Sequence, residues 1–88
     1  TFVCVAGDEA TGRQGKAFLE DTCCTPELVE CRDYETTVKI RFVAGKHHLL
    51  RADQEQELKM APELAARFLE RVDACLPDAD LVLLSDYG

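Results

Sequence analysis

The chain has 88 residues, a size that suits one small domain near the lower limit of what a hydrophobic core stabilises unaided. Its formal net charge of −7 argues against general nucleic-acid binding, because surfaces that bind phosphate backbones are basic. We identify no apolar run of membrane-spanning length and no opening signal peptide, so we expect no membrane partner.

The cysteine pattern argues against a disulfide framework. The five cysteines are Cys4, Cys23, Cys24, Cys31 and Cys75. Their number is odd, two of them are adjacent, and no Cys-x-x-Cys spacing occurs. Neither His47 nor His48 stands at a zinc-ligand spacing. We therefore predict reduced thiols in a cytoplasmic protein.

The first part of the chain predicts a core strand followed by a helix. Residues 2–6 form a continuous apolar run, which is typical of a strand covered on both faces. A Gly-Asp-Glu-x-x-Gly turn follows at residues 7–12. It leads into a helix that we expect near residues 9–20, with Phe18 and Leu19 facing inward.

The spacing of Gly7 and Gly12 is that of a phosphate-binding P-loop at its start. The pattern then fails, because Arg13 and the glutamine after it stand where lysine and serine or threonine are required. We interpret Asp8 and Glu9 as capping or first-turn residues of the helix, where acidic side chains are favourable, and assign them no catalytic role.

A β-hairpin is predicted in the middle of the chain, after a candidate strand near residues 28–32. In residues 36–43, apolar side chains alternate with two basic ones, the period-two pattern of a strand with one buried face. Gly45 supplies a turn residue that is free to adopt positive φ. A second strand is expected over residues 47–52.

The basic residues of this hairpin form the candidate binding site. Lys39 and Arg41 would lie on one strand face about 6–7 Å apart, at roughly 3.3 Å per residue. With Arg51 across the hairpin, three cations would converge on an exposed face and could hold a phosphate or a carboxylate. The alternative is that all three are ordinary solvated strand residues.

The last part predicts an amphipathic helix and a further apolar strand. The helix, near residues 62–76, carries an apolar stripe that includes Leu64 and Phe68. The run at residues 80–85 predicts a core strand. Asp86 follows it, and in open α/β sheets ligands bind just beyond the strand ends. The alternative for Asp86 is a turn aspartate that caps the next segment.

Both ends of the chain look cut, because apolar strands stand at or near each end without further fold. We therefore expect a piece of a larger α/β protein. It would form a single partial domain with a core strand and helix over residues 1–26, a β lid hairpin over 27–56, and a core helix and strand over 57–88.

Several of these motifs together carry a family resemblance. They are Thr36, Lys39, Arg41, Leu50, Arg51, Asp53, Glu55 and the Leu-Ser-Asp-Tyr ending at 84–87. The chain resembles the middle of a sugar kinase of the ribokinase (PfkB) family, with which it shares the Gly7-Asp8 turn. More narrowly, it is similar to the D-glycero-β-D-manno-heptose-7-phosphate kinase domain of bacterial ADP-heptose synthesis enzymes.

The resemblance implies a three-layer, Rossmann-like fold with a β-hairpin lid over a sugar pocket. It implies transfer of the γ-phosphoryl group of ATP, with Mg²⁺, to the anomeric hydroxyl of heptose 7-phosphate, leading to ADP-heptose and the lipopolysaccharide core. The hairpin cations would then face the sugar phosphate. The family's Gly-Gly-x-x-Asn and Gly-Ala-Gly-Asp motifs are absent from the chain, so we expect no catalytic base, ATP site or metal site within it.

The alternative function is a non-enzymatic α/β module whose hairpin binds a ligand or another subunit. Exposed edge strands of such a hairpin are suited to pairing with a second chain. We accordingly expect that the hairpin can mediate a homodimer.

Overall fold

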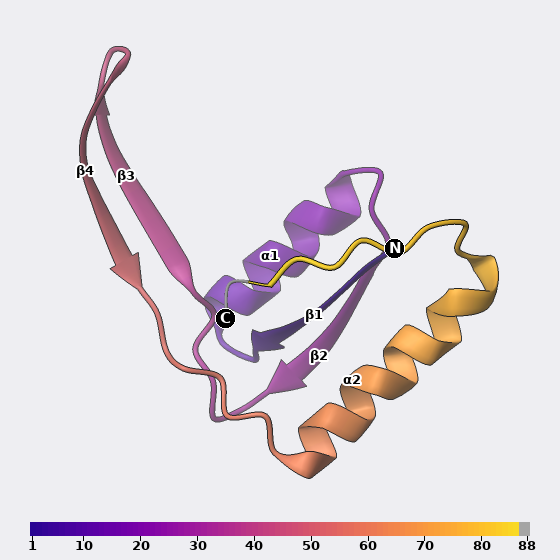
Figure 1. The fold of residues 1–88 in the computed structure, drawn as a ribbon. Coiled ribbons are helices and arrows are strands. Elements are labelled where there is room, and N and C mark those ends of the chain that lie inside the picture. The colour runs from indigo at the N-terminus through magenta and orange to yellow at the C-terminus, as the bar shows by residue number, and fades with distance from the viewer. Residues whose placement is uncertain (87–88) are drawn as a thin grey trace.

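The computed structural model describes residues 1–86. Its elements, in order, are β1 (Phe2–Gly7), α1 (Ala10–Asp21), β2 (Pro26–Cys31), β3 (Val38–Ala44), β4 (His47–Gln54), α2 (Pro62–Cys75) and the 3₁₀ helix η1 (Leu76–Asp78). They form two units: a core unit of β1, β2, α1 and α2, and a hairpin of β3 and β4 that projects from it (Figure 1). None of the described helices is long and apolar enough to cross a membrane.

The core unit is built on a parallel strand pair. β1 pairs with β2 in a register that runs from Phe2↔Pro26 to Gly7↔Cys31. Parallel strands need a crossover connection, and α1 supplies it. Both helices contact both strands. The buried hydrophobic residues of the described chain all lie in this unit, and they are Ala6, Val29 and Leu64.

The predicted helices are confirmed, and their buried faces differ in part from the expectation. Leu64 is buried and Phe68 is partly buried, as the stripe on α2 predicted. The inward orientation of Phe18 is wrong, because its exposed fraction is 69%. At 3.6 residues per turn, Leu19 shares a helix face with the buried Gly12, whereas Phe18 is turned about 120° away. Leu19 is accordingly the partly buried residue of the two.

The predicted hairpin is confirmed, and it lies away from the core. β3 and β4 pair antiparallel from Val38↔Gln54 to Ala44↔His47. The register shifts between Phe42 and Val43, where a bulge or irregularity interrupts the ladder. Gly45 makes the turn with φ of 59°, the left-handed region that favours glycine. Every residue of β4 is exposed, so the alternating pattern of β3 marks two faces and not a buried one.

The strand predicted over residues 80–85 is wrong. Residues 81–86 have no regular secondary structure, and Leu81, Leu83 and Leu84 are 85%, 89% and 87% exposed. A strand that is apolar on both faces needs hydrogen-bonded neighbours and covering layers. The described residues form a sheet of β1 and β2 alone beside this segment, and no ladder reaches it. The remaining structure is a small α/β unit, and its extension into a three-layer fold stays a prediction.

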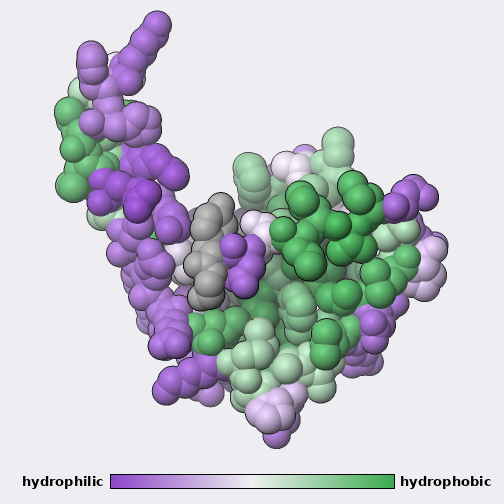
Figure 2. Space-filling view, viewed as in Figure 1, coloured by the Kyte–Doolittle hydropathy of each residue, from purple (hydrophilic) through white to green (hydrophobic). Residues whose placement is uncertain are grey.

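The core unit and the hairpin differ in the hydropathy of their surfaces. Apolar side chains gather over the core unit in Figure 2, where many remain open to solvent. The hairpin in the same view is mainly hydrophilic, with apolar side chains along its outer side.

Candidate functional site

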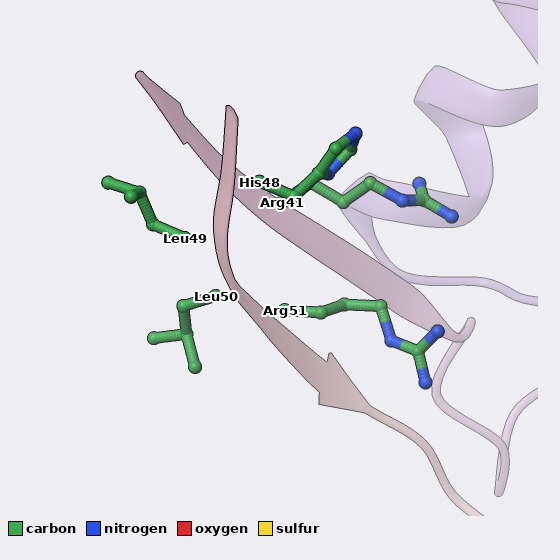
Figure 3. A pocket seen from close by; sticks show the side chains of 5 residues that line it. All are labelled: Arg41, His48, Leu49, Leu50 and Arg51. Carbon is green, nitrogen blue, oxygen red and sulfur yellow. The ribbon is translucent and has the colours of Figure 1, made fainter. Parts of the chain in front are cut away.

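The hairpin brings two arginines directly opposite each other. Arg41 on β3 and Arg51 on β4 are cross-strand partners, and their side chains extend to the same side of the hairpin (Figure 3). His48 points to that side as well, while Leu49 and Leu50 point to the other. Strand alternation directs Leu50 away from Arg51, and Leu49, the extra residue at the register shift, lies on the same side as Leu50. The hairpin therefore has a cationic face and an apolar face.

Two acidic residues near the base of the hairpin neutralise part of this cationic face. Asp53 lies 3.1 Å from Arg51 and 3.5 Å from Lys39. Glu55 lies 3.4 Å from Lys39. Within residues 1–86, the Arg41 side chain forms neither an ion pair nor a hydrogen bond, so it is the least neutralised of the three predicted cations.

The arrangement is suited to an anion. Like charges directly opposite each other in a sheet repel, and Arg41 and Arg51 stand in that relation. A bound phosphate or carboxylate would relieve the repulsion and could accept paired hydrogen bonds from a guanidinium group. An open hollow of about 310 Å³ is present here, lined by Arg41 and residues 48–51. Sequence reasoning missed His48 and the role of Asp53 as counter-ion, since neither cross-strand register nor side-chain direction can be read before the bulge is known.

Asp86 is not gathered into this hollow. It is exposed and lies in the irregular segment that replaces the predicted last strand. The reason for expecting a ligand beside it was its place at a strand end, and that strand is absent from the described residues. Tyr87, which belongs to the ending quoted in the resemblance, lies outside the described residues.

The junction between core and hairpin centres on Glu9. Glu9 is the N-cap of α1, and its Oε1 accepts a hydrogen bond from the Gly12 N–H at 3.1 Å. The same oxygen accepts one from the Thr36 N–H at 3.1 Å. The Gly7 N–H donates to the Thr36 hydroxyl at 2.9 Å. The capping role expected for Glu9 is thus confirmed, and a second role at Thr36 is added.

The acceptor position of Glu9 lowers its pKa. The Thr36 side chain contributes most, and backbone N–H donors add to it, while partial burial acts in the opposite direction. Glu9 Oε2 is buried without a hydrogen-bond partner among the described residues. The carboxylate lies at the helix N-terminus, where a P-loop would hold its phosphate. In this protein a side-chain carboxylate, that of Glu9, accepts the hydrogen bond at this helix N-terminus.

The two glycines of the turn are required for close approach. A Cβ on Gly7 would lie 1.8 Å from Glu9 Oε2 and 2.3 Å from the Tyr34 carbonyl oxygen. A Cβ on Gly12 would lie 2.1 Å from the Gly7 carbonyl oxygen. All three distances are far below a van der Waals contact, so the spacing that suggested a phosphate loop serves close packing of the turn at the hairpin base.

No other described group suggests a metal or redox centre. Within residues 1–86, no three or more histidine, cysteine, aspartate or glutamate side chains are arranged to hold a metal ion. The five cysteines are free thiols, and burial raises the pKa of Cys4. The five cysteines form no disulfide with one another here, and their reduced state stays a prediction.

Comparison with known proteins gives a consistent set of relatives. The chain is 38% identical over 88 residues to the bifunctional protein HldE of Paramagnetospirillum magneticum, and 41% identical over 94 residues to that of Rhodopseudomonas palustris. In each case the match covers 99% of this chain and 18% of the relative. The HldE of Koribacter versatilis is 29% identical over 88 residues. No protein-family model matches the chain.

These matches confirm the narrower resemblance drawn from the sequence. Proteins named HldE align with essentially the whole chain, and they are its homologues. The chain spans about 18% of the length of these relatives, so it corresponds to one part of such a protein.

Proposed function

We propose, from its homology to the bifunctional HldE proteins, that the full-length protein is an ATP-dependent carbohydrate kinase. It would phosphorylate heptose 7-phosphate at the anomeric position, in the cytoplasm, on the route to ADP-heptose and the lipopolysaccharide core. The observation that carries this proposal is the cationic face of the hairpin, where Arg41 and Arg51 stand opposite each other beside an open hollow.

The cationic face would hold the phosphate that the sugar already carries. In this role the hairpin is the lid of the sugar site, and Arg41 is its most available cation because Asp53 and Glu55 already pair with the other two. A net charge of −7 opposes anions at long range, so a phosphorylated sugar needs such a local basic patch. Holding the phosphate fixes the orientation of the anomeric hydroxyl, and phosphoryl transfer depends largely on positioning.

The proposal assigns ATP, Mg²⁺ and the catalytic base to parts of the full-length protein outside this chain. ATP supplies the phosphoryl group, and Mg²⁺ would neutralise its developing charge. Within residues 1–86, no three or more histidine, cysteine, aspartate or glutamate side chains gather to hold a metal ion, and the role that we propose for this segment is to bind the sugar phosphate.

The test is steady-state kinetics of full-length Arg41→Ala and Arg51→Ala, with sugar phosphate and ATP varied separately. A charge-assisted hydrogen bond is worth roughly 1.5–3 kcal/mol, so each substitution should raise the sugar-phosphate KM about 10- to 150-fold. Since this charge is present in ground and transition states alike, kcat and the ATP KM should change little. Lys46→Ala, at the exposed hairpin turn, is the matched control for loss of a cation.

A substitution that removes a negative charge beside the hairpin cations should have the opposite effect on sugar-phosphate binding. Asp53→Asn would release Arg51 and Lys39 from their shared partner. Exposed ion pairs are worth about 0.2–1 kcal/mol, so sugar-phosphate binding should tighten about 1.5- to 5-fold. Wild-type KM values in both arginine variants would instead mean that the hairpin cations are solvated residues without a substrate role.

The second candidate function is a non-enzymatic module that binds a ligand or a second copy through the hairpin. The observation that favours it is the apolar outer face, where Ile40, Phe42 and Leu50 are 48%, 49% and 60% exposed. Exposed apolar faces of this kind are common at subunit contacts. A homodimer through this face is compatible with the kinase, so only the absence of phosphoryl transfer from the full-length protein would favour the module alone.

A further inference from the structure

The hairpin is attached to the core unit by two short legs and little else. Its entry leg is residues 32–37 and its exit leg is residues 55–60 (Figure 1). β3 and β4 contact each other closely, but within residues 1–86 neither strand has extensive contact with a core strand or helix. The orientation of the hairpin must therefore be set where the legs meet the core.

Side-chain hydrogen bonds join the exit leg and the end of β4 to the entry leg. Gln56 accepts from the Glu35 N–H at 2.9 Å and donates to the Asp33 carbonyl at 3.4 Å. Gln54 donates to the Glu35 carboxylate at 3.2 Å. These contacts hold the two legs together, so a contact that fixes the orientation of the entry leg also fixes the orientation of the hairpin.

The entry leg is tied to the core at Thr36. Its N–H donates to Glu9 Oε1, and its hydroxyl accepts from the Gly7 N–H, with both bonds part-buried. An ion pair between Asp8 and Arg32 also bridges turn and leg, at 3.9 Å. Its Arg32 side chain is 92% exposed, and ion pairs of this kind contribute little.

Glutamate is an unusual choice for the position that Glu9 occupies. Helix N-caps prefer serine, threonine, aspartate and asparagine, whose short side chains reach the N2 or N3 N–H. Glu9 caps α1 at the Gly12 N–H and also reaches Thr36, 27 residues away in sequence. The longer side chain is explained by this second bond and not by capping.

We propose that Glu9 is a positioning residue for the hairpin: its carboxylate joins the N-terminus of α1 to Thr36 and so fixes the direction in which Arg41 and Arg51 face. The consequence for substrate binding rests on the function proposed above. The orientation of the hairpin itself does not, and it can be measured separately.

The first measurement is the distance between the hairpin tip and α1 in the full-length protein. Spin labels on noncanonical residues at Lys46 and Glu20, both exposed, avoid the five native cysteines. Glu9→Asp keeps a preferred N-cap but has a shorter reach, so it should retain the thermal midpoint and broaden the distance distribution. Asp8→Asn is the matched control on the neighbouring acid and should leave the distribution unchanged.

The second measurement is kinetic. Misplacement of a binding group by about 1 Å can cost up to 100-fold, so Glu9→Asp should raise the sugar-phosphate KM about 10-fold while the ATP KM stays constant. Thr36→Val removes the hydroxyl at similar volume and should act in the same direction, whereas Thr36→Ser keeps the hydroxyl and should remain close to wild type.

The outcomes separate this inference from the proposed function. A broadened distribution with a raised sugar-phosphate KM supports it. An unchanged distribution in both Glu9→Asp and Glu9→Ala overturns it. A released hairpin in an enzyme whose sugar-phosphate KM is unaltered supports the positioning role of Glu9 and overturns the substrate role proposed for Arg41 and Arg51. If the wild-type protein phosphorylates no sugar phosphate, the proposed function fails, and the distance measurement alone decides whether Glu9 orients the hairpin.

Discussion

The core unit and the hairpin use apolar residues in different ways. In the core unit, apolar side chains on β1, β2 and α2 pack between strands and helices, and the three buried hydrophobic residues are found there. In the hairpin, Ile40, Phe42 and Leu50 alternate with charged residues yet stay about half exposed or more. The same period-two pattern that marks burial in a packed sheet here separates two solvent-facing sides, so apolar content alone does not identify a core.

The largest effect is expected where the two units meet. Gly12→Ala would place a Cβ 2.1 Å from the backbone oxygen of Gly7, which cannot move like a flexible side chain. We expect a loss of about 3 kcal/mol or more, at the upper end for overpacking. The measurement is urea unfolding of the full-length protein.

The control for this prediction lies on the same helix. A Cβ on Gly15 would meet nothing within 4 Å, so Gly15→Ala should stabilise α1 by about 0.5–1 kcal/mol. Equal free energies of unfolding for the Gly12→Ala and Gly15→Ala variants would contradict the close approach at Gly12.

A further loss of stability should distinguish the core unit from the hairpin when a leucine in each is replaced by alanine. Leu64→Ala removes a side chain that is 6% exposed and should cost about 2–5 kcal/mol. Leu50→Ala removes one that is 60% exposed and should stay within about 0.5 kcal/mol. Thermal unfolding of both variants measures the contrast. A cost at Leu50 close to that at Leu64 would mean that a partner covers the apolar face of the hairpin.

The smallest effect concerns pH at the junction. The folded-state pKa of Glu9 is lowered, so its contribution to stability is complete above the ordinary glutamate pKa of about 4.3 and is lost as pH falls through the folded value. The stability difference between wild type and Glu9→Gln, followed by thermal unfolding from pH 7 to pH 3, should be constant down to that range and then shrink. A stability difference that grows on acidification would contradict a lowered pKa of Glu9 in the folded state.

Much of the fold could be predicted from local pattern. The alternation in β3, the glycine turn at Gly45 and the apolar stripe of α2 each depend on neighbours in sequence, and all three are confirmed. The strand over 80–85 could not be judged in this way, because strand formation depends on a pairing partner. Phe18 failed for a related reason: α1 carries too few apolar residues to define a face.

The candidate site was predictable in residue type and less so in geometry. Arg41 and Arg51 were expected on one face, and they lie opposite each other there. Their unequal neutralisation by Asp53 depends on register and rotamer, which the sequence does not specify. The bond from Thr36 to Glu9 joins residues 27 positions apart, and only the folded path of the chain brings them together.

Within the described part of the chain, the hairpin is attached to the core unit only at its base, so a small rotation there produces a larger displacement along the hairpin. β3 has 7 residues, so at about 3.3 Å per residue it is roughly 23 Å long. A tilt of about 10° at its base would move the tip by roughly 4 Å and Arg41, near the midpoint, by roughly 2 Å. A displacement of that size makes or breaks a hydrogen bond to a phosphate oxygen. In the function proposed above, a small change at the base, where Thr36 meets Glu9, would therefore decide whether Arg41 reaches the phosphate.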